Sequence, residues 1–338
     1  MRPHSPTHPG FELPVLRQFP PTRKYLVGVS GGRDSIVLLD CLVNLGYRNL
    51  VVCHLDHQLR GRQSRADSRF VQTLAQSHGL KFESRSENVR RLAANSKASI
   101  ETAGRDARYR FFAETARGAR CRTIFLGHHA DDLVETFVIN LFRGAGTSGL
   151  TGMRTESIRR IGRLELMVVR PLLGVWRNEI DQHIKARRLK FREDPTNRSL
   201  GPLRNRVRHK IIPFLEREFG RPIRKNLWRA ATIASEEEAF FEELLPKDVT
   251  GLRDLAVEPL RTMPVAMQRQ ILHRWLRKGD VSDVGFDLVE RVRQLLDLSN
   301  RVAKTNLPGR LHVRRQAGRL FVEGLKRQRR DPDFFDHQ

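Results

Sequence analysis

Hydrophobic residues change their spacing repeatedly along residues 24–187, and each change predicts a new element. Short apolar runs without a helix breaker indicate buried strands, whereas apolar residues three or four positions apart indicate helices. The runs predict strands over residues 24–29, 50–55, 81–84, 123–127 and 164–170. The helical spacing predicts helices over residues 35–45, 70–79, 99–116, 130–142 and 175–187. This alternation is typical of an α/β fold, in which helices cover both faces of a parallel sheet.

The pattern changes after residue 200, where helical spacing dominates. A basic stretch opens a helix at residues 204–210, and no strand pattern follows until about residue 300. Helices are expected over residues 222–245, 259–277 and 285–298, and a small hairpin over residues 311–313 and 320–322. We therefore expect a loose tail (1–22), an α/β domain (23–215), a smaller, mainly helical domain (216–325) and a charged tail (326–338).

Polar clusters follow several of the predicted strands at the point where each strand ends. They cover residues 30–35, 54–57 and 128–132. Ligands of parallel α/β sheets bind outside the carboxyl ends of the strands, which meet at one edge. The sequence therefore predicts a single site to which all these clusters contribute.

The first cluster is the stretch Ser30-Gly31-Gly32-Arg33-Asp34-Ser35. Glycine lets the backbone approach a ligand closely, and the start of a helix offers unpaired N–H groups and a positive dipole end. The stretch is therefore expected to hold phosphate, and a glycine turn without a ligand is the plain alternative. It lacks the ending of the Walker loop and the spaced glycines of the dinucleotide fingerprint. Instead it resembles the pyrophosphate loop of the ATP pyrophosphatases.

Composition narrows the class of partner and the compartment. A net charge of +24 and a pI of about 11.2 favour a polyanion such as nucleic acid over small metabolites alone. Cys41, Cys53 and Cys121 form no Cys-x-x-Cys pair, which indicates buried thiols in a reducing compartment. No apolar run approaches the ~18 residues of a membrane span. We therefore expect a cytoplasmic protein without a membrane partner.

Six further motifs follow the glycine loop in order. They read His-Leu-Asp-His-Gln-Leu-Arg-Gly (54–61), Glu-x-x-x-Arg-x-x-Arg-Tyr (101–109), Gly-His-His-x-x-Asp-x-x-Glu-Thr (127–136), Arg-Gly-x-Gly-x-x-Gly-Leu-x-Gly-Met (143–153), Arg-Pro-Leu-Leu (170–173) and Glu-Asp-Pro-Thr-Asn (193–197). Together they resemble the bacterial tRNA(Ile)-lysidine synthetases, which belong to the ATP-pyrophosphatase (PP-loop) class. One departure is Gly104, where the family pattern leads us to expect alanine.

The resemblance implies a Rossmann-like ATP-pyrophosphatase domain, of the adenine nucleotide alpha hydrolase-like fold, followed by a mainly helical tRNA-binding domain. It implies a ligase that uses ATP and Mg²⁺ on tRNA(Ile) with a CAU anticodon. ATP adenylates the C2 carbonyl oxygen of the wobble cytidine, and the amine of free L-lysine then displaces AMP to leave lysidine. The modified tRNA reads AUA and is charged with isoleucine. Larger members carry a third domain, for which we expect this chain to be too short, and a homodimer stays open.

Roles for single residues follow from these motifs and from the chemistry of a triphosphate. We expect ATP to contact the loop and polar side chains near it, with a salt bridge within its own loop as the alternative for Asp56: Ser30, Gly31, Gly32, Arg33, Asp34, Ser35, His54, Asp56 and Arg105. Asp34 and Asp132 are predicted Mg²⁺ ligands, with helix capping as the alternative for Asp34. Arg108 is predicted to neutralise charge as diphosphate leaves, with a surface arginine as the alternative.

The attacking lysine must lose a proton, because the reference pKa of its amine is about 10.4. Glu135 is predicted to hold the ammonium and His128 to accept the proton or orient the adenylate, whereas His129 is expected to be merely packed. The predicted catalytic set is Asp34, Arg108, His128, Asp132 and Glu135. Lysine binding is assigned to Glu135, Glu193, Asp194 and Asn197, with a self-bonded turn as the alternative for the last three. A zinc site is disfavoured, because the spacing of His54, His57, His128 and Cys53 does not suit one.

Basic residues beyond the glycine loop are the predicted contacts to tRNA: Arg143, Arg154, Arg204, Arg206, Arg208 and Lys210. The glycine-rich stretch 143–153 is predicted to be a mobile lid over the anticodon base, because single-stranded bases are read after being splayed out.

Three other functions compete with the ligase. A tRNA thiolase needs catalytic or cluster-binding cysteines, which the three scattered cysteines do not resemble. An amidating ligase such as an NAD or GMP synthetase acts on a small molecule and does not need such a high positive charge. A basic RNA-binding protein would use ATP only structurally. Transfer of labelled lysine to tRNA distinguishes the ligase from all of them.

Overall fold

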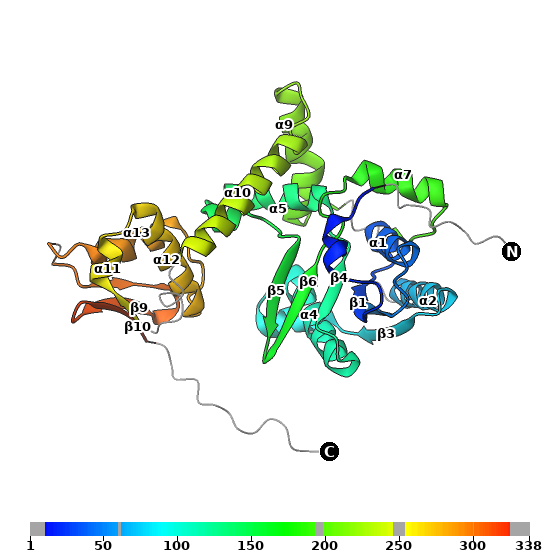
Figure 1. Ribbon diagram of the computed structural model, residues 1–338, viewed down its shortest axis with the longest axis horizontal. Helices are drawn as coiled ribbons and strands as arrows, with labels where there is room; N and C mark the ends of the chain where they lie inside the picture. The colour runs from blue at the N-terminus through cyan, green and yellow to red at the C-terminus, as the bar shows by residue number, and fades with distance from the viewer. Residues whose placement is uncertain (1–10, 60–61, 194–198, 246–253, 300, 325–338) are drawn as a thin grey trace, which may run out of the picture. The chain divides into compact units, whose positions relative to one another are not determined.

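The computed structural model describes residues 11–59, 62–193, 199–245, 254–299 and 301–324 (Figure 1). These residues form two compact units. The first unit comprises the residues up to Ile139 together with Gly152–Ala231, and the second comprises Asn140–Thr151 together with the residues from Thr232 onward. Each unit has a hydrophobic core of its own.

The first unit is built on a six-stranded sheet in the order β3-β2-β1-β4-β6-β5. Its strands are β1 (Tyr25–Gly28), β2 (Leu50–Asp56), β3 (Lys81–Ser86), β4 (Thr123–Leu126), β5 (Glu156–Ile161) and β6 (Leu164–Val169). All neighbours pair in parallel except β5, which runs antiparallel to β6 at one edge. The predicted α/β fold with a parallel sheet is thus confirmed, and β3 lies at the other edge.

Helices cover both faces of this sheet. Helices α1 (Arg33–Asn44), α2 (Arg62–Ser77) and α7 (Arg177–Arg187) share a core with Val27, whereas α4 (Ile100–Ala119) shares another core with Leu26. Leu26 and Val27 are adjacent in β1 and therefore point to opposite faces of the sheet. Because helices cover both faces, each of the two side chains is 0% exposed. The strand is apolar on both sides for this reason.

The first unit contains further elements besides these. They are η1 (Pro14–Gln18), α3 (Val89–Ser96), most of α5 (Ala130–Phe142), α8 (Leu203–Arg206), the π-helical turn η3 (Val207–Ile211), α9 (Ile212–Glu218) and the start of α10 (Arg224–Leu244). Asn88 and Ser99 cap α3 and α4 by accepting backbone N–H groups through their side chains. These caps fix where the helices begin.

Residues 11–22 differ from the loose tail expected there. Val15 and Leu16 of η1 are buried in the core that contains Val27. The Tyr47 hydroxyl donates to the Phe19 carbonyl oxygen at 2.5 Å. Proline-rich composition indicated no packing, but the apolar residues between the prolines bury enough surface to hold this segment on the sheet. Residues 1–10 lie outside the described part of the chain.

The second unit combines helices with a four-stranded antiparallel sheet in the order β7-β10-β9-β8. Its elements are α6 (Thr147–Leu150), the rest of α10, β7 (Asp254–Ala256), α11 (Val257–Arg261), α12 (Val265–Lys278), α13 (Phe286–Arg293), η5 (Gln294–Leu296), β8 (Lys304–Asn306), η6 (Pro308–Arg310), β9 (His312–Gln316) and β10 (Arg319–Glu323). The predicted hairpin is confirmed as β9 and β10. Among the described helices of the protein, none is long and apolar enough to cross a membrane.

The three cysteines of the chain are free, buried and confined to the first unit. Burial raises the pKa of the Cys41 and Cys53 thiols, and the neighbouring Asp40 and Glu83 charges add to this effect. Both thiols therefore stay protonated, as expected of inert core cysteines.

Candidate active site

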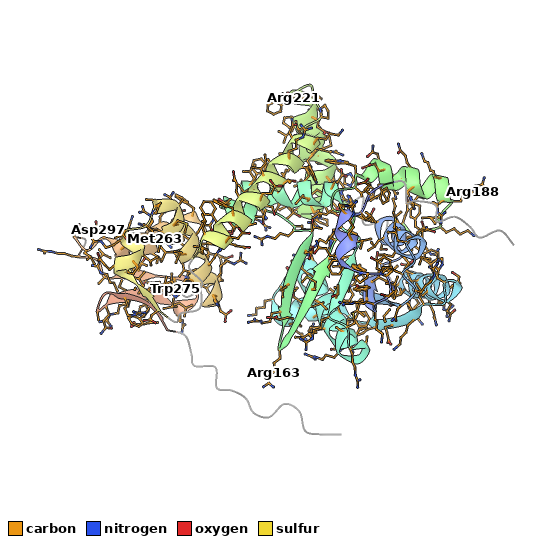
Figure 2. The ribbon with its side chains drawn as sticks, in the orientation of Figure 1. Arg163, Arg188, Arg221, Met263, Trp275 and Asp297 are labelled. Atoms are coloured by element: carbon orange, nitrogen blue, oxygen red, sulfur yellow. The ribbon has the colours of Figure 1, made fainter. Side chains whose placement is uncertain are left out.

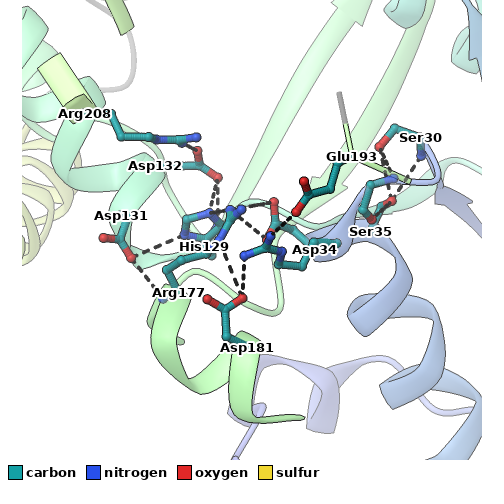
Figure 3. A network of polar contacts seen from close by, with 12 residues as sticks. Ser30, Asp34, Ser35, His129, Asp131, Asp132, Arg177, Asp181, Glu193 and Arg208 are labelled. Atoms are coloured by element: carbon teal, nitrogen blue, oxygen red, sulfur yellow. Dashed lines mark hydrogen bonds and ion pairs between the residues drawn. The ribbon is translucent and has the colours of Figure 1, made fainter. Parts of the chain in front are cut away.

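The predicted phosphate loop joins β1 to α1 and is closed by its own serines (Figure 3). The hydroxyl oxygens of Ser30 and Ser35 lie 3.2 Å apart, and the Ser35 hydroxyl donates to the Gly32 carbonyl oxygen at 2.8 Å. Gly31 has a φ of +88°, which residues other than glycine rarely adopt. Gly32 caps α1 without a side-chain hydrogen bond, so the first N–H groups of α1 remain suited to an anion.

Arg33 turns from the loop toward acidic residues. Its Nη1 donates to Asp181 Oδ1 at 2.6 Å, and its Nη2 donates to Glu193 Oε1 at 3.0 Å. Glu193, a predicted lysine ligand, is therefore joined to Arg33, a predicted ATP ligand. The other two predicted lysine ligands of this turn, Asp194 and Asn197, lie outside the described residues.

His54 and Asp56 are buried at the end of β2. His54 Nδ1 donates to the Val29 carbonyl oxygen at 2.9 Å, and burial lowers the pKa of His54, which keeps the ring neutral. Asp56 accepts the Gln58 N–H at 2.8 Å and the Ser86 hydroxyl at 3.3 Å. These contacts stabilise the rim beside the loop, and the contact of both residues with ATP stays a prediction.

Gly127 brings the end of β4 against the first turn of α1. A Cβ atom at this position would lie 2.9 Å from the Asp34 carbonyl oxygen and 3.1 Å from the Ser35 amide nitrogen. Only a residue without a side chain permits such an approach between two backbones. The histidines that follow Gly127 therefore lie directly beside the glycine loop. The clusters 30–35 and 128–132 thus meet, as predicted.

His129 is the centre of a polar network between these two clusters (Figure 3). Its Nε2 lies 3.9 Å from Asp34 Oδ2 and 3.6 Å from Asp132 Oδ2, and its Nδ1 lies 3.6 Å from Asp131 Oδ2. Burial lowers the pKa of His129, but the surrounding carboxylates outweigh burial and raise it above its ordinary value. His129 was expected to be merely packed, and the structure instead makes it the bridge between the carboxylates.

Arg177 begins α7 and supplies the network with a second cation. Its Nη1 lies 3.1 Å and 3.2 Å from the two carboxylate oxygens of Asp34. Its backbone N–H donates to Asp131 Oδ2 at 3.0 Å. Burial raises the pKa of Asp34, although His129 and Arg177 oppose it. Helix α7 is thus attached to the first turns of both α1 and α5.

Glu135 and Asp132 lie on one face of α5 and share Arg208. Arg208 donates to the two carboxylate oxygens of Glu135 at 2.5 Å and 3.0 Å, and to Asp132 Oδ1 at 3.2 Å. Arg208 belongs to η3, whose Val207 packs against Val134 of α5. π-helical turns often occur at functional sites, because they place side chains where a regular helix would not.

Arg204 joins the same group from α8. Its Nη2 donates to the Thr136 hydroxyl at 2.6 Å, and its Nε lies 3.6 Å from Glu135 Oε2. Arg204 and Arg208 were predicted to contact tRNA phosphates, and in this structure both face carboxylates of α5. Their contact with tRNA stays a prediction.

The network gives its titratable groups different proton affinities. Burial raises the pKa of Glu135, although Arg208 opposes it. Burial also acts on Asp132, but His129 and the nearby arginines outweigh it, and the pKa of Asp132 falls to about 2. Burial and nearby arginines lower the pKa of His128 to about 3, and His128 Nδ1 has no hydrogen-bond partner among the described residues. At neutral pH Asp132 is therefore an anion and His128 a neutral acceptor.

Arg108 and Arg105 lie on α4. Arg108 Nη2 lies 3.4 Å from His57 Nε2, and burial together with Arg108 lowers the pKa of His57 to about 4. The charge of Arg108 also contributes to the low pKa of His128, so Arg108 is close to the predicted catalytic residues. Arg105 is exposed and lies 3.9 Å from Glu101.

The remaining predicted tRNA contacts lie on three different segments. Arg206 Nη1 donates to the Gly201 carbonyl oxygen at 3.1 Å, and the Lys210 side chain is exposed. The Arg154 carbonyl oxygen accepts a hydrogen bond from the buried Arg170 at 2.7 Å. These contacts leave the phosphate-binding role as a prediction.

The glycine-rich stretch predicted to be a lid belongs in part to the second unit. It contains the short helix α6 and the exposed Arg143, and Ser148 Oγ lies 3.4 Å from His273 Nδ1. Gly152, at its end, has a φ of +62°, and a Cβ atom there would lie 2.8 Å from a Leu133 methyl group. Its role as a lid stays a prediction.

Comparison with known proteins assigns the chain to a family. Residues 12–215 match the PP-loop domain family, and residues 255–321 match the TilS substrate binding domain. A tRNA(Ile)-lysidine synthase of Chlorobaculum tepidum is 35% identical over 283 residues, which cover 80% of this chain and 82% of that protein. The chain belongs to the tRNA(Ile)-lysidine synthase family.

This chain spans about two thirds of the length of several other lysidine synthases that it matches. The enzyme of Geobacter sulfurreducens is 39% identical over 88% of this chain, which spans 64% of that protein. For the enzyme of Thermus thermophilus the identity is 34%, over 93% of this chain and 59% of that protein. Among solved structures, the U34-tRNA thiolase NcsA of Methanococcus maripaludis matches 64% of this chain and 72% of its own at a TM-score of 0.49 and 18% identity.

Asp34 and Asp132 of this lysidine synthase family member suit the predicted Mg²⁺ ion. Their carboxylates come from the first turns of two helices and converge on His129 Nε2, at 3.9 Å and 3.6 Å. Mg²⁺ is commonly held by one or two carboxylates together with substrate phosphates. In the described part of the chain, no group of three or more His, Cys, Asp and Glu residues is placed to hold a metal. Two converging carboxylates beside the phosphate loop are suited to an ion that also binds phosphate.

Sequence reasoning did not single out His129, Asp131 and Arg177, which contact the candidate site residues of this family member. Asp131 stands inside a recognised motif but was not singled out, and Arg177 stands in a predicted helix without a motif. The available signal was the position of Arg177 shortly after the Arg-Pro-Leu-Leu stretch, at the start of the helix. Its pairing with Asp34 spans 143 positions, which no local pattern reveals.

Proposed function

We propose that this protein ligates L-lysine to C2 of the wobble cytidine in tRNA(Ile) with a CAU anticodon, with ATP converted to AMP and diphosphate. The observation that carries the proposal is that the predicted site residues of the first unit contact one another at the edge of the sheet. There the phosphate loop, two converging carboxylates and the buried Glu135 belong to one network of contacts. The names of the relatives and the match to the TilS substrate binding domain support the tRNA substrate.

ATP is proposed to bind at the glycine loop. Backbone N–H and hydroxyl groups of Ser30, Gly31, Gly32 and Ser35 suit the β- and γ-phosphates. Arg108 is proposed to neutralise the charge that develops on the leaving diphosphate. Mg²⁺ held by Asp34 and Asp132 would supply positive charge to the phosphate oxygens. Further contacts to the nucleotide are proposed for Arg33, His54, Asp56 and Arg105.

The reaction is proposed to proceed in two displacements. The C2 carbonyl oxygen of the cytidine attacks the α-phosphorus of ATP, and diphosphate leaves. The ε-amine of lysine then attacks C2, the bond from C2 to the adenylate oxygen breaks, and AMP leaves. The amine gives up a proton in this second step, so a neutral amine must be generated in the site.

Glu135 is proposed to hold the lysine ammonium, with Glu193, Asp194 and Asn197 completing the lysine pocket. Arg208 already pairs with Glu135, so a cation is accommodated at this carboxylate. His128 is a weak base, because the pKa of its ring is only about 3. We therefore assign His128 to orienting the adenylate through a hydrogen bond that its ring accepts, rather than to accepting the proton of lysine.

The tRNA is proposed to be bound by Arg143, Arg154, Arg204, Arg206, Arg208 and Lys210. The exposed Arg206 and Lys210 side chains are suited to backbone phosphates, which supply most of the salt-dependent affinity of such complexes. Free lysine, ATP and this tRNA are all cytoplasmic molecules, so we propose a cytoplasmic enzyme.

Transfer of labelled lysine tests the proposed function. Purified protein, ATP, Mg²⁺ and a transcript of the CAU-anticodon tRNA(Ile) are expected to yield one labelled lysine per tRNA, with equal amounts of AMP and diphosphate. A transcript with uridine at the wobble position is the control and is expected to take up none. If no lysine is transferred, the function is not the one proposed. If Asp34→Asn or Asp132→Asn retains full transfer, the assignment of the metal ligands is wrong.

A further inference from the structure

A groove on the first unit is lined by residues to which, apart from Lys210, no role has been given above. It has a volume of about 540 Å³ and lies on η3 and α9. In Figure 1, α9 stands clear of the sheet of its own unit, and Figure 2 labels Arg221 just beyond the end of this helix. The lining residues are His209, Lys210, Ile211, Pro213, Phe214 and Arg217.

Phe214 gives the groove a flat, solvent-facing surface. Its side chain is 50% exposed, so part of the ring faces the solvent. The Arg217 guanidinium lies 5.2 Å from the centre of the Phe214 ring, which is the geometry of a cation–π contact. Ring and guanidinium together offer planar groups of the kind on which nucleic-acid bases stack.

The charge of the groove favours an anionic partner. Lys210 and Arg217 are exposed, and none of the described residues that line the groove is acidic. The Glu218 carboxylate lies 3.2 Å from Arg217 Nε and neutralises part of that charge, which leaves Lys210 as the main phosphate contact. Planar groups beside cations are typical of sites for single-stranded nucleic acid, because bases stack on the former and phosphates pair with the latter.

The position of the groove selects the tRNA over another nucleic acid. Arg208 contacts the carboxylates of Glu135 and Asp132, and the next two residues of the same π-helical turn line the groove. A strand bound in the groove therefore contacts the same π-helical turn that supplies Arg208 to these carboxylates. The single-stranded anticodon loop of a tRNA has unstacked bases that can stack on such a surface.

We propose that this groove binds tRNA next to the nucleotide being modified. Phe214 and Arg217 stack one unpaired base, and Lys210 pairs with a backbone phosphate. This inference rests on the proposed function for the identity of the RNA. It adds a base-stacking surface on α9 to a set of contacts that so far consisted of charges alone.

Replacement of the aromatic ring tests the stacking contact. Phe214→Ala in the full chain is expected to raise the Kd for the CAU-anticodon tRNA about 5- to 150-fold, the range seen when one base–aromatic stack is removed. The matched control is Phe219→Ala, because Phe219 is 61% exposed beyond the end of the same helix and does not line the groove. This control is expected to change the Kd less than twofold. An equally small change for Phe214→Ala overturns the proposal.

Two further measurements separate stacking from charge and from a structural effect. Phe214→Trp is expected to keep the affinity, and its added fluorescence is expected to be quenched by tRNA, unlike that of Phe219→Trp. Lys210→Ala is expected to lower the slope of log Kd against log salt by about 1, whereas Phe214→Ala leaves the slope unchanged. Absence of quenching at position 214 overturns the stacking contact.

The same variants tell an RNA-binding groove from a protein-binding one. If Phe214→Ala changes the oligomeric state while tRNA affinity stays the same, the groove binds protein and the inference is wrong. If the wild-type protein transfers no lysine but Phe214→Ala loses tRNA affinity, the proposed function fails and the groove stands. If the wild-type protein transfers lysine and the tRNA affinity of Phe214→Ala is unchanged, the proposed function holds and only the inference about the groove is wrong.

Discussion

Carboxylates and arginines of the site that are far apart in the sequence pair with each other and neutralise each other's charge. Asp34 meets Arg177 over 143 positions, and Glu135 meets Arg208 over 73 positions. Buried carboxylates need such partners, because an unpaired charge in the interior costs several kcal/mol. The cations of α7 and η3 are therefore as much a part of the site as the carboxylates of α1 and α5.

Gly127→Ala is expected to reduce lysine transfer about 100-fold, a loss typical of catalytic groups displaced by roughly 1 Å. The added methyl group would lie 2.9 Å from a backbone oxygen of the first turn of α1, so the loop or the end of β4 must move. The measurement is kcat for lysine transfer. Gly118→Ala on α4 is the matched control, because its methyl group meets nothing within 4 Å. Transfer within twofold of wild type in Gly127→Ala would contradict the close approach.

Gly104→Ala is expected to stabilise the protein by about 0.5–1 kcal/mol, since glycine inside a helix is unfavourable by this amount relative to alanine. A methyl group there would lie 3.5 Å from Val89 Cγ1 and from His57 Nδ1, which are ordinary contact distances. Urea unfolding of wild type and variant measures the difference. A lower free energy of unfolding in the variant would show that these neighbours do not accommodate alanine.

The motifs predicted which residues gather at the rim of the sheet but not how they pair. The loop, Asp132 and Glu135 follow from local patterns, because glycine spacing and helical spacing act over a few positions. The bridging role of His129 depends on three carboxylates that only the fold brings together. The inward direction of Arg208 depends on a π-helical turn, which the basic stretch at 204–210 does not reveal.

Among the elements, long and apolar ones were predictable and short or polar ones were not. The helix over residues 130–142 was predicted with both ends correct, because its apolar residues recur at helical spacing. Strand β5 was missed because three of its six residues, Glu156, Arg159 and Arg160, are charged and interrupt any apolar run, and β7 and β8 because each has only three residues. The antiparallel pairing of β5 with β6 likewise depends on tertiary contacts.

Asp40→Asn is expected to destabilise the first unit by about 1.5–3 kcal/mol at neutral pH, the usual range for hydrogen bonds to a buried charge. Asp40 on α1 lies 2.8 Å from His183 Nε2 and 3.3 Å from Arg187 Nη2 on α7. Burial raises the pKa of Asp40, but these two hydrogen bonds outweigh it and lower the pKa below the ordinary value. The contact joins the two helices that carry Asp34 and Arg177.

The destabilisation is expected to depend on pH. Because the pKa of Asp40 is lowered in the folded state, its contribution is fully present above the unfolded value of about 3.9 and is lost as the pH falls through the folded value. The difference between wild type and Asp40→Asn should therefore shrink below about pH 4. Unfolding measured by circular dichroism checks this, with the exposed Asp106→Asn as control, expected to stay within about 0.5 kcal/mol. A difference that is constant down to pH 2 would contradict the assignment.

At the scale of the whole molecule, charge and division into units govern behaviour in solution. The net charge of +24 makes association with any polyanion strongly dependent on salt. The two units have separate cores, so unfolding need not be a single transition. The excess charge is counted directly from the sequence, and the change in hydrophobic pattern after residue 200 predicted a second domain. The boundaries expected for the domains stay a prediction.

Arg206→Ala is expected to weaken tRNA binding and to lower the slope of log Kd against log salt by about 1, because one phosphate contact releases about one counterion. Filter binding at several salt concentrations measures both quantities. Arg17→Ala is the control, because Arg17 is an exposed arginine on η1, which lies outside the predicted tRNA contacts. An unchanged slope for Arg206→Ala would remove Arg206 from the contacts to tRNA.

The buried thiols described above give the protein an internal reporter. Since Cys41, Cys53 and Cys121 all lie in the first unit and the sequence has no other cysteine, an alkylating reagent can label the chain only when that unit opens. Pulse labelling followed by mass spectrometry would therefore measure the rate at which the first unit opens, independently of unfolding of the second unit. Saturating ATP should slow this labelling in proportion to how tightly it binds the closed form.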